Sequence, residues 1–237
     1  MNAELLKLRV LPTPRLILAL CFGSITVVAL IVLAVRPSNI DVYREAPDVM
    51  AQTAVVIGAI VFGAWVTGVE FAQGTLRRAL IAEPRRATIL LNKYAVILVA
   101  SMCTAALCAI LALALGKLTA SVNTVAFDSS NALKEVGTTM LQAGFVSTLS
   151  ASITLLLRSF AGGLIGSFVL LFVIDGVLQL SSAIRHYTFG SAMSDIAAAA
   201  GGDIHTHSVA AAALIAAAWV TAAAVPAAAR FMRGDCK

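Results

Sequence analysis

Six apolar runs, each of about 20 residues, constrain the fold of this chain more than any other feature of its sequence. They cover residues 16–35, 49–69, 94–115, 138–157, 160–181 and 208–229. A helix rises 1.5 Å per residue, so about 20 residues cross a hydrocarbon core of about 30 Å. Hydrophobic residues make up 60% of the chain and charged residues 12%, about half the usual share. The sequence therefore predicts an all-α membrane protein, with one domain over residues 1–237 and six transmembrane helices.

The distribution of Lys and Arg predicts the orientation of these helices. With the N-terminus inside, twelve basic residues fall on the cytoplasmic side: Lys7, Arg9, Arg15, Arg77, Arg78, Arg85, Arg86, Lys93, Arg158, Arg230, Arg233 and Lys237. Five fall outside: Arg36, Arg44, Lys117, Lys134 and Arg185. An excess of positive charge marks the cytoplasmic side, and six spans then place both termini there. Because the net charge of +5 comes from short loops between spans, it does not indicate nucleic-acid binding.

The most basic of the connections is the stretch 70–93, EFAQGTLRRALIAEPRRATILLNK, between the second and third spans. Thr75 can cap a short helix, and Leu76, Ala79 and Leu80 would share one apolar face of it. Pro84 would end this helix, because the residue before a proline avoids the α region. Two interpretations stay open: the helix rests on lipid headgroups, or it docks on a soluble partner.

Other segments outside the spans carry weaker signals. Residues 1–15 suit a short interfacial helix that Pro12 and Pro14 end, and residues 36–48, 116–137 and 182–207 are expected outside the membrane. Asp203, His205 and His207 could share one side of an extended stretch, but without a fourth ligand a polar loop is favoured over a metal site. The four cysteines form neither a disulfide framework nor a metal motif.

One set of residues in this stretch comprises Glu70, Gly74-Thr75-Leu76-Arg77, Leu80, Pro84, Arg86 and Lys93. It follows a pattern similar to that of ABC-2 type permeases, the membrane subunits of many bacterial ABC exporters. The resemblance covers nearly the whole chain when the six spans are included. It implies an elbow helix before the first span, a cytoplasmic coupling helix at about 74–83, and a short re-entrant outer element between spans five and six. It also implies a bacterial cytoplasmic membrane.

By this resemblance, a separate ATPase subunit supplies the energy and holds ATP and Mg²⁺, and two copies of it serve a pair of permeases. The chain itself has no GxxxxGK[ST] phosphate loop and is not expected to hydrolyse ATP or bind a cofactor. The second permease would be another copy or a related chain. The residues expected to couple the chain to the ATPase are Glu70, Gly74, Thr75, Leu76, Arg77, Arg78, Leu80, Pro84, Arg85 and Arg86.

Polar residues inside the spans suggest where a substrate could pass. Asp175 lies about fifteen residues into span five, and a carboxylate at that depth is costly unless it meets a partner or water. Asp175 and Gln179, one turn apart, and Gln142 in the hydroxyl-rich span four are candidates for the translocation path. Structural hydrogen bonds between spans are the alternative. The aliphatic spans favour a hydrophobic or amphipathic cargo, such as a drug, antibiotic or lipid, and Asp175 hints at a cationic group.

A non-ABC protein with six spans, either a secondary carrier or a membrane scaffold, is the rival interpretation. A carrier would normally show paired charges within the membrane, or broken helices at corresponding positions of two halves. The chain has one buried acid in its spans and no internal repeat. The sequence therefore favours the ABC permease.

Overall fold

The computed structural model describes residues 12–35, 42–74, 86–123, 131–201 and 207–233, and these are helical apart from short turns. The five longest helices are α2 (Pro12–Val35), α3 (Val42–Gln73), α5 (Arg86–Val122), α6 (Ala132–Leu157) and α10 (Val209–Arg233). Between α6 and α10 lie α7 (Phe160–Phe168), the π-helix η1 (Val169–Ile174), α8 (Asp175–Gln179), the 3₁₀-helix η2 (Arg185–Tyr187) and α9 (Phe189–Gly201).

Six helical segments in the described part of the chain are long and apolar enough to cross a membrane. Five belong to the long helices, and the sixth is the continuous segment Phe160–Gln179, which combines α7, η1 and α8. This confirms the prediction of an all-α chain with six membrane-like helices. The elbow helix predicted over residues 1–15 lies outside the described residues as far as residue 11, and Pro12 and Pro14, which were predicted to end it, instead lie in the first turn of α2. The coupling helix predicted at about 74–83 lies outside the described residues from residue 75 on.

Several helices continue into segments that were predicted to be loops. Residues 42–48 are the first turns of α3, residues 116–122 the last turns of α5, and residues 132–137 the first turns of α6. The loop prediction was wrong there because it relied on polarity, and polar residues continue a helix that extends beyond an apolar core. At 37 residues, α5 is about 55 Å long, well above the 30 Å of hydrocarbon.

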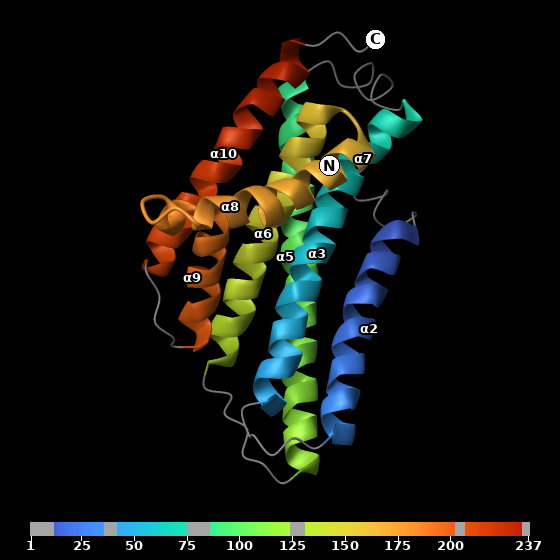
Figure 1. The fold of residues 1–237 in the computed structure, drawn as a ribbon. Helices are drawn as coiled ribbons and strands as arrows, with labels where there is room; N and C mark the ends of the chain where they lie inside the picture. Colours follow the sequence, from blue (N-terminus) through green and yellow to red (C-terminus); the bar gives the residue numbers. More distant parts are fainter. Residues whose placement is uncertain (1–11, 36–41, 75–85, 124–130, 202–206, 234–237) are drawn as a thin grey trace.

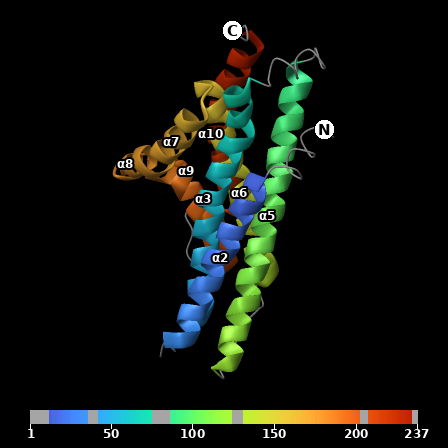
Figure 2. The same cartoon turned by 90° about the vertical axis from the view of Figure 1, so that its right-hand side faces the viewer.

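The bundle is built around α6, which packs against α3, α5, α7, α9 and α10 (Figure 1). Its hydrophobic core joins α3, α5 and α6, with Ile60, Ile97 and Leu149 among the fully buried side chains. α2 packs on α3 and α5 at the edge of the bundle. In both views α2 begins well below the start of α5, so the two helices are displaced along the bundle axis (Figures 1 and 2).

The fifth candidate span leaves the bundle obliquely. Arg158, in the left-handed region at φ 53°, ends α6, and Ser159 caps α7 by accepting a hydrogen bond from the Gly162 N–H. The connection between α6 and α7 therefore consists of these two residues alone. α7 packs on α6 and α3, but η1 and α8 run across and away from the other helices (Figures 1 and 2). Of the predicted span 160–181, α7 is thus the part that packs along α6.

The segment 182–207, predicted as a polar external connection, contains a helix that returns to the bundle. This helix, α9, packs against both α6 and α10. Phe189, Ala192 and Ile196 on its inner side are fully or almost fully buried. Polar residues of the segment lie in its turns and at the positions that hold α9 against the bundle.

Candidate functional site

The candidate coupling segment is attached to the end of the bundle where α3, α6 and α10 end and α5 and α7 begin, which we call the basic end (upper end in Figure 1). α3 ends at Gln73, and Gly74 follows with φ 63°, in the left-handed region that favours glycine. The next described residue is Arg86, the first of α5. The other predicted coupling residues between these two lie outside the described residues: Thr75, Leu76, Arg77, Arg78, Leu80, Pro84 and Arg85.

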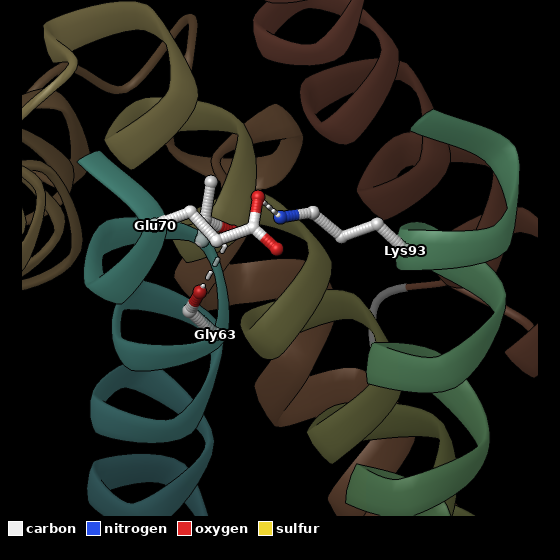
Figure 3. A network of polar contacts seen from close by, with 4 residues as sticks. Gly63, Glu70 and Lys93 are labelled. Carbon is white, nitrogen blue, oxygen red and sulfur yellow. Dashed lines mark hydrogen bonds and ion pairs between the residues drawn. The ribbon is translucent and has the colours of Figure 1, made fainter. Parts of the chain in front are cut away.

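A buried ion pair joins the two helices that flank this segment. The Lys93 ammonium of α5 donates to the Glu70 carboxylate of α3, and the two residues are only 5% and 2% exposed (Figure 3). Two charges removed from water are tolerated only when each finds a close partner. The pair therefore holds the end of α3 and the beginning of α5 together.

Glycines let α3 approach its neighbours closely along the same stretch. A Cβ at Gly63 would overlap the backbone carbonyl of Ser147 in α6, and one at Gly68 would lie 2.7 Å from the Cα of Phe160 in α7. Small residues at such positions let helix backbones approach one another closely. As a result, Glu70 lies on a helix fixed on two sides, and its carboxylate faces α5 inside the bundle (Figure 3).

Arg86 ties the other flank of the segment to the last helix of the chain. Its guanidinium donates to the main-chain carbonyls of Met232 at 3.0 Å and Phe231 at 3.4 Å, in the last turn of α10. These carbonyls have no partner within their own helix, and a cation there also interacts favourably with the helix dipole. Glu70 and Arg86 were both expected to couple the chain to an ATPase. In the structure each of them also joins two neighbouring helices.

Two more arginines join the ends of α6 and α10 reciprocally. Arg158, at the end of α6, donates to the carbonyl of Arg230 at 3.1 Å. Arg230, near the end of α10, donates to the carbonyl of Leu156 at 2.6 Å. Together with Arg86, these bonds connect the ends of α5, α6 and α10 at one level. Nothing in a linear pattern indicates which carbonyls such arginines reach, so sequence reasoning missed these contacts.

The three candidate path residues lie at α9 or at its start: Asp175, Gln179 and Gln142. One Asp175 oxygen accepts the Gly190 N–H at 2.8 Å and the other accepts the Gln179 side-chain amide at 2.6 Å. Gln142 donates to the Met193 carbonyl of α9 at 2.8 Å. Asp175 is 4% exposed, and its carboxylate lies at the positive end of the α9 dipole. These bonds favour the structural alternative, since both Asp175 oxygens already have partners.

Some hydroxyl groups of α6 bond to neighbouring helices, and others, such as those of Thr148 and Thr154, donate to carbonyls of α6 itself. Ser147 donates to Ser101 of α5 at 2.8 Å, and Ser150 donates to the Ile60 carbonyl of α3 at 2.7 Å. Ser152 lies 2.9 Å from the Tyr94 hydroxyl of α5. Hydroxyls at helix interfaces commonly hold spans together in this way. For this span the structure supports the interpretation in which the hydroxyls bond their own helix or a neighbour.

Asp195 is a buried acid that the sequence did not single out. Its carboxylate accepts the His207 N–H at 3.2 Å, so the end of α9 is tied to the start of α10. The His207 ring in turn contacts the carbonyl of His186 at 3.0 Å. Among the described residues no cluster of three or more His, Cys, Asp or Glu could hold a metal ion, and Asp203 and His205 lie outside them.

Comparison with protein-family models, curated proteins and solved structures found no match to this chain.

Proposed function

We propose that this chain is the permease subunit of an ATP-driven ABC exporter in a bacterial cytoplasmic membrane. In this proposal the basic end and both termini face the cytoplasm. A separate ATPase subunit, present in two copies with ATP and Mg²⁺, contacts the segment 74–85. A second copy of the chain, or a related permease, completes the transporter.

The observation that carries the proposal is that both flanks of this segment are fastened into the bundle. Glu70, one turn before the end of α3, pairs with Lys93 of α5, and Arg86 bonds to the end of α10. A push on residues 74–85 would therefore reach three helices together, without first stretching a flexible connection. That is the property required of a segment through which an ATPase moves spans as rigid bodies.

The described part of the chain also offers a candidate for an outer lid. The chain turns between α8, at the end of the fifth candidate span, and α9, and the Asp175 carboxylate closes this turn by accepting the Gly190 N–H. Such a turn supports the re-entrant element that the resemblance implies. In the proposed exporter it would cover the outer end of a path for a hydrophobic or amphipathic cargo, with Asp175 positioning α9.

Co-purification of the ATPase tests the proposal. Reversing two charges in the segment with Arg77→Glu/Arg78→Glu should abolish recovery of a Walker-type ATPase with the permease from native membranes, because the docking surface would lose its positive charge. The matched control is Lys117→Glu/Lys134→Glu, a double reversal of exposed lysines at the other end of the bundle, which should leave recovery unchanged.

Two results would count against the proposal. One is equal recovery of the ATPase with both double variants. The other is recovery of the wild-type chain alone under conditions where control ABC complexes survive. The second result would favour a six-span secondary carrier or a membrane scaffold, and residues 74–85 would then be assigned to the lipid surface.

A further inference from the structure

A cavity of about 250 Å³ lies between α2, α3 and α5, with one wall contributed by α6. Apolar side chains such as Ile17, Val55, Phe62 and Ala100 form most of its surface. An apolar cavity of about 150 Å³ can hold a benzene molecule, so by proportion this one holds roughly ten carbon atoms. Its size and chemistry fit a short alkyl chain.

Arg15 is the charged residue of this lining, and no acidic residue accompanies it. Ser101 and Thr104, which also line the cavity, already donate to the carbonyls of Leu98 and Ala100 in their own helix. A guanidinium carries five N–H donors, so a partner elsewhere does not exhaust it. Arg15 is therefore the group in the cavity suited to bind an anion.

The position of Arg15 makes this site unusual. The sequence placed Arg15 before the first span, yet it lines the same cavity as residues 100–105 of α5. Those residues lie roughly 20–30 Å along α5 from its start, at 1.5 Å per residue. α2 is displaced along the bundle relative to α5 (Figures 1 and 2), and Arg15 in its first turn lines the cavity together with these residues. Arg15 is exposed and begins the first candidate span, so its guanidinium is accessible to a ligand that enters the cavity.

A second cavity, of about 220 Å³, serves as an internal comparison. It lies on the other side of the contact between Cys21 and Gly58, and its lining contains apolar residues, Ser24 and Thr53 but no ionisable acid or base other than the Cys21 thiol. The two spaces are similar in size and differ chiefly in Arg15. Any preference of the first for an anion should therefore come from Arg15.

We propose that the cavity between α2, α3 and α5 binds a single-chain amphipathic anion, with its alkyl chain against the apolar walls and its anionic group on Arg15. This inference concerns binding and does not depend on an ATPase partner. It also replaces the cationic ligand suggested by Asp175, whose two oxygens are bonded within the protein.

Decanoate and 1-decanol are matched probes, because they share a ten-carbon chain and differ in charge. Binding of each radiolabelled probe would be measured to the full chain in phosphatidylcholine nanodiscs, with empty nanodiscs as background. Decanoate should bind saturably above background. Arg15→Gln should weaken decanoate binding about tenfold, as expected for loss of a charge-assisted contact, and leave decanol unchanged. Arg15→Lys should keep decanoate binding within a few-fold of wild type.

A second pair of variants tests the cavity itself. Ala100→Leu places a larger side chain in the lining and should weaken both probes, whereas Ala95→Leu, on an exposed position of the same helix, should weaken neither. Unchanged decanol binding shows that Arg15→Gln is folded, and a size-exclusion profile that matches wild type shows that Ala100→Leu is folded. The proposal is overturned by the absence of saturable decanoate binding, by unchanged decanoate affinity in Arg15→Gln, or by equal effects of Ala100→Leu and Ala95→Leu.

The source of the anion can be identified in the same assay. If phosphatidylglycerol in the nanodisc displaces decanoate, an anionic membrane lipid competes for the site with one of its chains. If it does not, the site takes free single-chain anions. Both results support the proposed chemistry and separate its two sources.

Discussion

Removing one partner of the Glu70–Lys93 pair should be among the most damaging single changes in this protein. Lys93→Met keeps a long side chain but leaves the Glu70 carboxylate, 2% exposed, without its ammonium partner. Breaking a buried pair in this way costs about 3–5 kcal/mol of unfolding free energy. A loss of 3 kcal/mol corresponds to roughly a 150-fold change in the unfolding equilibrium. Glu70→Leu should have a similar effect by leaving Lys93 unpaired.

The double variant Glu70→Leu/Lys93→Met gives the decisive comparison. It leaves no buried charge, and replacing a buried ion pair with apolar residues is often neutral or stabilising. Its stability should therefore lie within about 1 kcal/mol of wild type, far from the sum of the two single losses. Reversible unfolding in SDS from mixed micelles would measure all four proteins. Lys117→Met, at an exposed position, is the control and should change stability by less than about 0.5 kcal/mol.

Two outcomes would refute this reasoning. Single variants that each lose less than about 1 kcal/mol would show that water reaches the pair. A double variant as unstable as the sum of the singles would show that packing, rather than charge, governs these positions. If the double variant is stable, co-purification with the proposed ATPase subunit would show whether the charged pair is also needed for the proposed coupling.

Glycine substitutions provide two further tests, each with a matched control. Gly190→Ala would place a Cβ onto the Asp175 carboxylate and should lower the apparent melting temperature by several degrees, an overpacking cost of about 1–3 kcal/mol, whereas Gly176→Ala in open space should not. Gly63→Ala would push α3 away from a backbone carbonyl of α6 and should be at least as damaging, while Gly23→Ala should be tolerated. Equal melting temperatures within either pair, by size-exclusion thermostability, would contradict the close contacts.

The approximate positions of the spans could be predicted because apolar length is a local property. The 20-residue runs reappear as six membrane-like helices. Their true ends could not be predicted, since residues such as 116–122 are polar but remain helical in α5. The oblique course of the fifth span could not be predicted from the sequence either. Six residues of π-helix, Val169–Ile174, precede Asp175 and change which side of the helix it faces, although their sequence is uniformly apolar.

The candidate site shows the same division between local and tertiary information. The turn at Gly74 and the buried polar side chain of Asp175 follow from residue type and spacing. The partners of Glu70 and Arg86 depend on helices 23 and about 145 residues away in sequence. A single sequence contains no signal that pairs Arg86 with the end of α10. The sequence showed Lys93 and Glu70 as two charged residues of one motif, but it did not indicate that they form an ion pair.

The central position of α6 also has a consequence for how the chain enters the membrane during synthesis. Of the six candidate spans α6 has the lowest mean hydropathy, yet more of it is buried than of any other. Several of its hydroxyl groups bond to α3 and α5, which are synthesised before it, and to α7, which follows, while others bond to carbonyls of α6 itself. Each such bond relieves a polar group that would otherwise face hydrocarbon. The helix that organises the bundle is thus the one least suited to insert alone, and its insertion depends on partners already in place.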